Sequence, residues 1–272
     1  AQFVGRKVPT SSREIIEAGP RLKVIGRAGA GVDNIDVKAA TERGIVVLNT
    51  PGGNAEAAGE LAIAMMFALA REIPRADASM KAGTWDKKSF GGGVELLGKT
   101  LGLVGIGHVG SVVGARALGL GMKVLAHDPG VSADRTRELG FQPAGFEEVI
   151  RQADFLSIHA PRNEQTKGMV GAKAFAMMKK GVFLVNCARG GIVVEKDLAA
   201  ALDAGIVRGA GVDVFDKEPC EDWSLAKHPK VIATPHIGAS TAEAQVNVSV
   251  MIARQIGLYL TKGEVINAVK PK

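Results

Sequence analysis

The stretch Leu101-Gly102-Leu103-Val104-Gly105-Ile106-Gly107-His108-Val109-Gly110 decides the fold of this 272-residue chain. An apolar run leads into the spacing GxGxxG, and an apolar helical pattern follows it. In that context the first glycine permits a tight turn, the second lets a ligand approach the backbone, and the third lets helix and strand pack closely. The helix N-terminus offers N–H donors and partial positive charge to phosphates. We therefore expect Gly105, Gly107 and Gly110 to form a dinucleotide-binding turn; the alternative is a plain glycine turn.

An acidic residue ends the next expected strand. Asp128 lies 18 residues after Gly110 and follows the strand expected at 123–126. A carboxylate there accepts hydrogen bonds from the adenosine ribose hydroxyls and repels a 2′-phosphate. No arginine follows directly, since Asp128-Pro129-Gly130 predicts a turn. The sequence thus predicts NAD rather than NADP.

Outward from this turn, expected strands and helices alternate along almost the whole chain, which indicates an α/β protein with parallel sheets. A linker is expected at 91–93, so we predict two domains with a cleft between them. Before the linker we expect strands at 3–4, 22–25 and 45–48 and helices at 12–18, 36–43 and 54–82, the last with Pro74 as the place for a kink. After it we expect strands at 101–104, 123–126, 155–158, 182–185, 209–212 and 231–232 and a helix at 241–260.

Composition narrows the class of protein. Hydrophobic residues make up 46% and charged residues 23%, which is typical of a globular protein. The longest apolar run, 61–70, is too short to span a bilayer. The net charge is +6, but the basic residues are dispersed, which favours steering of anionic ligands over nucleic-acid binding. Cys187 and Cys220 form neither a disulfide framework nor a metal motif, so we expect a reducing cytoplasm and no metal.

Three functional side chains are expected at one edge of the dinucleotide sheet. Arg189, Glu218 and His236 each follow an expected strand, and ligands bind at the carboxyl edge of open α/β sheets. Oxidation of an alcohol needs a base for the hydroxyl proton, and histidine titrates near neutral pH. A neighbouring carboxylate favours imidazolium, and arginine offers a planar fork to a carboxylate or carbonyl oxygen. Each residue alone is more commonly structural, but their joint placement favours a catalytic site.

These residues stand in strings that resemble a known family. Arg189-Gly190-Gly191, Asp213-Val214-Phe215 with Glu218-Pro219, and Pro235-His236-Ile237-Gly238 are similar to signature blocks of the D-isomer-specific 2-hydroxyacid dehydrogenases. The similarity covers nearly the whole chain. Within the family, the segments 26–36, 186–193 and 238–241 most resemble the phosphoglycerate dehydrogenase branch. The resemblance implies that Arg189 binds substrate, Glu218 pairs with the histidine, and His236 is the general acid and base.

The resemblance also implies contacts to small molecules. Together with the glycine turn, the expected cofactor-binding residues are Ala30, Gly105, Gly107, His108, Val109, Gly110, Asp128, Ala160, Cys187, Ala188, Arg189, Asp213, His236, Gly238 and Ala239. The expected substrate-binding residues are Arg6, Arg27, Gly29, Ala30, Gly31, Arg189 and His236, with Lys87 and Lys88 as further candidates. Backbone N–H groups of the turn at 27–31 offer a nest for a carboxylate; the alternative is an ordinary strand-to-helix turn.

The domain roles follow the same resemblance. We expect a substrate-binding domain with a dimerisation helix and arm at 1–97, a Rossmann-type doubly wound dinucleotide-binding domain at 98–236, and a returning helix at 237–272. The substrate domain is expected to be flavodoxin-like and truncated by about one strand–helix unit, with no regulatory extension after Lys272. At 54–60, alanine or glutamate replaces the family's usual hydroxyl residues, which leaves substrate placement there open. A homodimer, or a dimer-based tetramer, is expected.

Several functions remain open at this point. The first is NAD-dependent oxidation of D-3-phosphoglycerate to 3-phosphohydroxypyruvate, as in serine biosynthesis. The second is reduction of glyoxylate, hydroxypyruvate or another 2-oxoacid by the same three residues. A third, of another class, is an NAD-sensing binding protein like the C-terminal-binding-protein corepressors, and a catalytically dead fragment would look similar. Formate dehydrogenase is disfavoured because those enzymes use an Asn-Arg-Gln-His pattern, whereas this chain has the acidic residue Glu218 in place of the glutamine.

Overall fold

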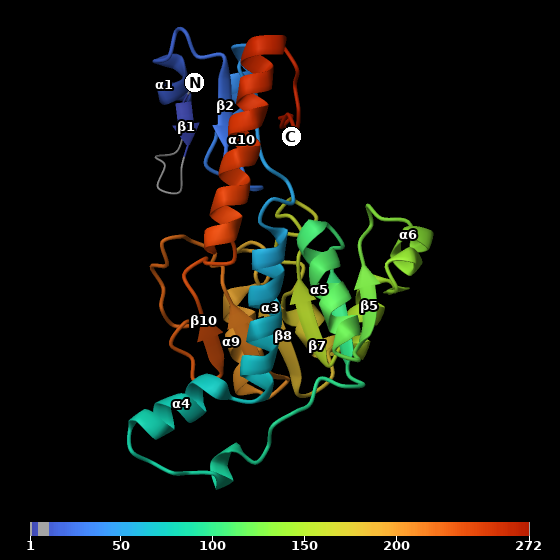
Figure 1. Ribbon diagram of the computed structural model, residues 1–272. Helices are drawn as coiled ribbons and strands as arrows, with labels where there is room; N and C mark the ends of the chain where they lie inside the picture. Colours follow the sequence, from blue (N-terminus) through green and yellow to red (C-terminus); the bar gives the residue numbers. More distant parts are fainter. Residues whose placement is uncertain (1, 5–10, 272) are drawn as a thin grey trace. The chain divides into compact units, whose positions relative to one another are not determined.

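The computed structural model describes residues 2–4 and 11–271 (Figure 1). It divides into two compact units, Ala1–Ala57 with Ala239–Lys272, and Ala58–Gly238. The N-terminal part of the first unit therefore ends at Ala57, well before the domain boundary expected at residue 97. The physical reason is that Met65, Met66 and Leu69 are buried in the core of the second unit. The roles expected for the two domains remain predictions.

The first unit is a small parallel sheet with helices on both faces. Its elements are β1 (Gln2–Val4), α1 (Arg13–Glu17), β2 (Val24–Arg27), α2 (Val37–Glu42), β3 (Val46–Leu48) and α10 (Ala242–Lys262), and the sheet order is β1-β2-β3. Successive residues of β2 face opposite sides. Ile25 packs with Ile16 of α1, whereas Val24 packs with Ile252 and Ile256 of α10. Thr241 caps α10 by accepting the N–H of residue 244 at 3.1 Å.

The second unit is built on a seven-stranded parallel sheet. Its strands are β4 (Thr100–Val104), β5 (Lys123–His127), β6 (Gln142–Pro143), β7 (Phe155–Ile158), β8 (Val182–Asn186), β9 (Val207–Val212) and β10 (Val231–Ala233). Their order is β10-β9-β8-β7-β4-β5-β6. The chain runs outward from β4 through β5 and β6, then returns to β7 on the other side of β4. That reversal makes a doubly wound, Rossmann-type sheet whose switch point lies between β4 and β7.

Helices cover both faces of this sheet (Figure 1). On one face are α3 (Ala55–Ala70) and α5 (His108–Gly119), which contribute Met66 and Val113 to the core. On the other are α7 (Phe146–Gln152), α8 (Ala172–Met177) and α9 (Glu195–Asp203), which contribute Ile150, Phe175 and Leu202. The short α6 (Ala133–Glu138) follows β5. Because both faces are covered, β7 and β8 are buried along their whole length, as their apolar sequences predict.

The single helix expected at 54–82 is wrong, because the structure has two. α3 ends at Ala70, and α4 (Ile73–Lys81) begins after a break. Glu72 adopts a left-handed backbone conformation with φ of 51°, which no regular helix allows. Pro74 lies in the first turn of α4, where its missing N–H would be unpaired in any case. A short 3₁₀ turn, Lys88–Phe90, follows before the chain enters β4.

Among the described residues, no helix is both long enough and apolar enough to cross a lipid bilayer. No group of three or more His, Cys, Asp or Glu side chains in that part of the chain is placed to hold a metal ion.

Candidate active site

The glycine turn at the switch point requires glycine at two positions. Gly105 has a φ of +92°, and a Cβ there would lie 2.7 Å from the backbone nitrogen of Ala160. At Gly110 a Cβ would lie only 2.0 Å from the carbonyl oxygen of Gly105. Gly107 precedes α5 and has no heavy atom within 4 Å of its own Cβ position. The turn is therefore packed tightly against the protein on one side and open at the start of the helix.

Asp128 is fixed against this turn. One carboxylate oxygen accepts the Ile106 N–H at 2.7 Å, and the other accepts the Gly130 N–H at 2.8 Å. A carboxylate has about four lone-pair sites, so each oxygen retains capacity for a further donor. The backbone bonds hold the negative charge beside the start of α5.

The three candidate catalytic residues follow neighbouring strands. β8, β9 and β10 are parallel, with Asn186 paired to Val212 and Val212 paired to Ala233. Because these pairs are the last residues of their strands, the loops that follow leave the sheet at one edge. Arg189, Glu218 and His236 lie on those three loops.

His236 and Glu218 form a directly hydrogen-bonded pair. Nδ1 of His236 lies 2.6 Å from Oε2 of Glu218, while Oε1 of Glu218 accepts the Phe215 N–H at 3.1 Å. The hydrogen bond that His236 donates to Glu218 raises the pKa of His236, and burial opposes this only in part. Burial raises the pKa of Glu218, but the His236 bond and charge, the Phe215 N–H and the Arg189 charge outweigh it and lower the pKa overall. With Nδ1 anchored, the ring's other nitrogen, Nε2, is left to exchange a proton with a ligand.

The loop that carries Arg189 is organised by a buried amide. Asn186, the last residue of β8, accepts the Ala188 N–H at 3.1 Å and donates to the Arg189 carbonyl at 3.2 Å. The guanidinium of Arg189 donates to the Ala188 carbonyl at 2.7 Å. Its charge also reaches the catalytic pair, since it lowers the pKa of both Glu218 and His236. A cation thus stands beside the imidazole–carboxylate pair.

The loop that carries His236 is held by Asp213, which is fully buried. One oxygen of Asp213 accepts the Thr234 hydroxyl at 2.6 Å and the Ile237 N–H at 2.8 Å. The other accepts the Gly238 N–H at 2.8 Å. His236 itself has a left-handed backbone with φ of 53°, which is unfavourable for a residue other than glycine. Three hydrogen bonds to one carboxylate keep the loop in that conformation.

The model of one protein family matches residues 63–238 of the chain: the D-isomer specific 2-hydroxyacid dehydrogenases, NAD binding domain. The chain belongs to the D-isomer specific 2-hydroxyacid dehydrogenase family. The matched residues include the glycine turn, Asp128 and all three candidate catalytic residues.

Curated relatives are identical to the chain at about half of the aligned positions. It is 50% identical to a D-3-phosphoglycerate dehydrogenase of Archaeoglobus fulgidus over 92% of the chain and 47% of that protein. It is 51% identical to D-3-phosphoglycerate dehydrogenase 3, chloroplastic, of Arabidopsis thaliana over 93% and 42%, respectively. For the enzyme of Mycobacterium tuberculosis the identity is 44% over 97% and 50%. The chain therefore spans about half the length of these relatives.

Solved structures of the family superimpose along most of the chain. A glyoxylate reductase from Paecilomyes thermophila is 35% identical, with a TM-score of 0.88 over 96% of this chain and 80% of that one. A D-mandelate dehydrogenase from Rhodotorula graminis is 27% identical, with a TM-score of 0.90 over 99% and 83%. These likenesses confirm the predicted α/β fold class.

The second unit contains the family's NAD-binding domain, and its residues fit that cofactor. The open start of α5 at Gly107 leaves room for a pyrophosphate beside the helix N-terminus. Asp128 stands where an adenosine ribose is expected, and its charge disfavours a 2′-phosphate. Among the other expected cofactor residues of this unit, Ala160 lies against Gly105, whereas His108 and Val109 form the first turn of α5. The individual contacts remain predictions.

Two further expected cofactor residues, Cys187 and Ala188, are buried directly after β8. The thiol of Cys187 lies 3.7 Å from the Met65 sulfur, and burial followed by the charge of Asp213 raises its pKa. Cys187 is therefore a neutral, inert thiol at neutral pH, and any contact to the cofactor would be a packing contact.

The expected substrate residues of the first unit are only partly free to bind an anion. Gly29 donates its N–H to the Thr50 hydroxyl at 2.8 Å, so it is not available to the expected carboxylate nest. Ala30 and Gly31 remain candidates, and Arg27 donates to the neighbouring carbonyl of residue 28. Ala239 also belongs to this unit. Arg6 lies outside the described residues.

Sequence reasoning missed the residues that hold the catalytic loops in place by hydrogen bonds to their backbone. Asn186 and Glu195 have no expected role, and Asp213 is expected only as a cofactor contact. One signal was available for Asn186 and Asp213, because each is a polar residue at or directly after the end of an apolar strand. Glu195 carries no such signal, since an acidic residue in the first turn of a helix is commonplace.

Proposed function

We propose that this chain is the catalytic core of an NAD-dependent dehydrogenase that oxidises D-3-phosphoglycerate to 3-phosphohydroxypyruvate, a step of serine biosynthesis. The observation that carries the reaction class is the His236–Glu218 pair, 2.6 Å apart, beside Arg189 at the carboxyl edge of the sheet. The choice of substrate is supported by the identity of 44–51% to D-3-phosphoglycerate dehydrogenases.

The three residues have separate tasks in this proposal. The substrate's 2-hydroxyl gives its proton to Nε2 of His236, and Glu218 stabilises the imidazolium that results. Arg189 binds the substrate carboxylate or the carbonyl oxygen that develops, because its fork matches either group. When bound, NAD supplies the acceptor for the hydride that leaves the 2-carbon. In reverse, His236 returns the proton to the ketone oxygen.

A reductase of glyoxylate, hydroxypyruvate or another 2-oxoacid is the second candidate. It is favoured by the 35% identity and TM-score of 0.88 to a glyoxylate reductase. The two candidates share the catalytic residues and differ in whether a phosphate is recognised. We assign that recognition to Arg6 and Arg27, with Lys87 and Lys88 as further contributors.

An assay of initial rates separates the candidates. NADH formation is followed with D-3-phosphoglycerate and with D-glycerate, and NADH consumption with glyoxylate and hydroxypyruvate. A kcat/KM at least about 10-fold higher for the phosphorylated acid than for D-glycerate supports the proposal, in line with one charged hydrogen-bond pair. Arg27→Ala should lower kcat/KM for D-3-phosphoglycerate much more than for glyoxylate. Equal rates for both acids would favour the reductase.

We infer that the chain assembles as a homodimer, or a dimer-based tetramer, through α4 and the segment after it. Ile73, Met80 and Trp85 are 52%, 55% and 80% exposed, and Met80, Trp85 and Phe90 line one hollow. α3, by contrast, packs within its own unit. A two-fold interface would bury this apolar surface. Light scattering should give twice the chain mass, and Trp85→Glu should give the monomer mass.

We also propose a cytoplasmic location. The free cysteines Cys187 and Cys220 support a reducing compartment. Fractionation of the source cells with an antibody against the chain would test this, and recovery outside the cytoplasm would contradict it.

A further inference from the structure

Glu195 accepts a hydrogen bond from the turn that leads to Glu218. No part of the proposed mechanism uses this residue. It is the first residue of α9, and its Oε1 accepts the Asp216 N–H at 2.6 Å. The preceding N–H of the same turn, from Phe215, is accepted by Glu218 at 3.1 Å. Two successive backbone donors are therefore taken by two carboxylates, one in α9 and one in the catalytic pair.

The same turn is in contact with the loop of Arg189. Gly190, which follows Arg189 directly, approaches it so closely that a Cβ at this position would lie 1.8 Å from the Phe215 carbonyl oxygen and 2.8 Å from the Asp216 nitrogen. The turn at 215–216 is thus fixed on one side by Glu195 and on another by Gly190. A displacement of this turn would therefore move Glu218 and also disturb the loop that carries Arg189.

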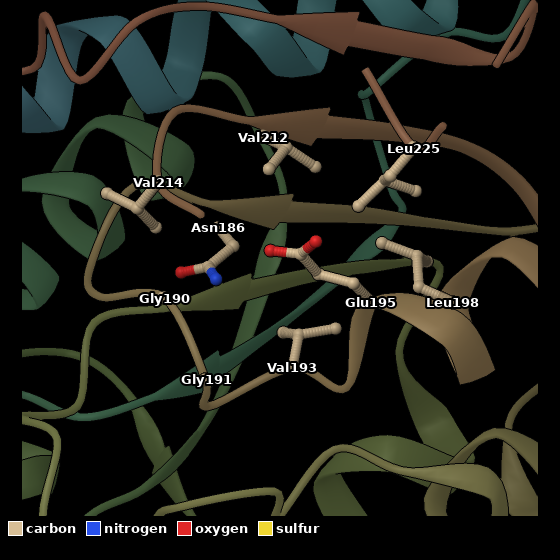
Figure 2. A pocket seen from close by; sticks show the side chains of 9 residues that line it. All are labelled: Asn186, Gly190, Gly191, Val193, Glu195, Leu198, Val212, Val214 and Leu225. Atoms are coloured by element: carbon tan, nitrogen blue, oxygen red, sulfur yellow. The ribbon is translucent and has the colours of Figure 1, made fainter. Parts of the chain in front are cut away.

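Glu195 also lines a small hollow, together with residues of β8, β9 and the loops that follow these strands (Figure 2). The hollow is lined by Asn186 at the end of β8, by Gly190 and Gly191 from the Arg189 loop, and by Val212 and Val214 from β9 and its continuation, among others. The side chains of Asn186 and Glu195 both point into it. Asn186 holds the carbonyl of Arg189 at 3.2 Å, so the two polar side chains in this hollow each fix one catalytic loop.

We propose that Glu195 is a positioning residue, which acts through the Asp216 N–H to hold Glu218, and through Glu218 the imidazole of His236, in the reactive geometry. The inference rests on the proposed function, because it concerns the same catalytic pair. The task needs a hydrogen-bond acceptor at the place of Oε1 and not a negative charge. Glu195→Gln should therefore keep it, and Glu195→Ala should lose it.

Asp197 provides a matched control on the same helix. Its Oδ2 accepts the Ala172 N–H at 2.8 Å, so Asp197→Ala also removes an acidic residue from the first turn of α9 and a bond to a backbone N–H. That bond leads to the start of α8 instead of a catalytic loop. Any general loss of helix stability should appear equally in both alanine variants.

The first experiment measures kcat, KM and the dissociation constant of NADH for the wild type and the three variants. Glu195→Ala should lower kcat about 10- to 100-fold, the size expected for a small misplacement of catalytic groups. Its NADH affinity should stay within about 3-fold of wild type, because the glycine turn and Asp128 are untouched. Glu195→Gln and Asp197→Ala should keep kcat within about 3-fold. An unchanged kcat in Glu195→Ala, or an equal loss in Asp197→Ala, would overturn the proposal.

The second experiment does not depend on turnover. The pKa of His236, which Glu218 and Asp213 raise and Arg189 lowers, is followed by NMR of histidine-labelled protein without substrate. Glu195→Ala should shift this pKa downward, toward that of Glu218→Gln, while Glu195→Gln and Asp197→Ala leave it in place. An unmoved pKa in Glu195→Ala would overturn the positioning role. If the wild type turns over no hydroxyacid but the pKa shifts as expected, the proposed function fails and the positioning role stands.

Discussion

Replacing His159 with glutamine should make the stability of the chain less sensitive to acid. His159 follows β7 beside the glycine turn, and its Nε2 lies 2.8 Å from the hydroxyl of buried Ser157. Its Nδ1 is enclosed and has no hydrogen-bond partner among the described residues. Burial of the imidazole disfavours its charged form and lowers its pKa from 6.5 to about 4. The native protein therefore holds this side chain neutral at a pH where the unfolded chain is already protonated.

The sign and size of the effect follow from this difference. Because the folded pKa lies below the unfolded one, the neutral side chain contributes no penalty above about pH 6.5, and stability falls as the pH drops from there toward about 4. A shift of 2.5 units, taken from 6.5 and about 4, corresponds to at most about 3 kcal/mol, of which about 2 kcal/mol is lost by about pH 5. This free energy is an upper limit, since His159 as a whole is only partly buried.

Urea unfolding at several pH values between about 7 and 4.5 measures this loss. Glutamine can still bond to Ser157 but does not titrate in this range. Because the substitution also changes packing at every pH, the quantity compared is the change in the free energy of unfolding with pH. His108→Gln, which removes an exposed histidine from the same unit, is the control for loss of a histidine as such. Parallel curves for wild type and His159→Gln would refute the reasoning.

The remaining predictions concern the catalytic loops and the cofactor turn. His236→Ala should lower kcat by about 10²- to 10⁴-fold, the usual range for a lost general base, and leave the NADH dissociation constant, measured by fluorescence, nearly unchanged. The rate of alcohol oxidation should rise with pH through the raised pKa of His236, because only the unprotonated imidazole accepts a proton; Glu218→Gln should move that rise to lower pH, and an unmoved pH–rate profile would count against the pair. Gly190→Ala should lower the melting temperature and activity together, since its Cβ would lie 1.8 Å from the Phe215 carbonyl oxygen; an unaltered melting temperature would contradict that packing. Asp128→Ala should weaken NAD binding by about 10-fold or more and reduce the preference for NAD over NADP; the dissociation constants of both cofactors measure this.

The parallel sheet could be predicted from the sequence because its strands are buried on both faces. Strands such as Phe155–Ile158 and Val182–Asn186 therefore read as short apolar runs between turn signals. The positions of Arg189, Glu218 and His236 at one edge follow from the same pattern, since parallel strands bring their carboxyl ends together. Their hydrogen bonds could not be predicted, because they depend on how three loops far apart in sequence pack.

The break between α3 and α4 shows what local sequence does not encode. Residues on both sides favour helix, and no glycine marks the left-handed position at Glu72. The core contacts of Met66 and Leu69 end with α3, whereas no described residue of α4 is buried. The helix thus stops where its contacts with the sheet stop, which is a tertiary cause.

The same distinction explains why the catalytic loops need residues outside the catalytic trio. Each loop leaves a strand of the sheet, but a strand fixes only the loop's first residue. His236 has a left-handed backbone that its own sequence disfavours, and three hydrogen bonds to Asp213 hold it there. Asn186 holds the Arg189 loop in a comparable way, through a buried amide at the end of β8. By this logic the loop of Glu218 requires its own polar anchor, and Glu195 is a side chain from another element that accepts a hydrogen bond from its backbone.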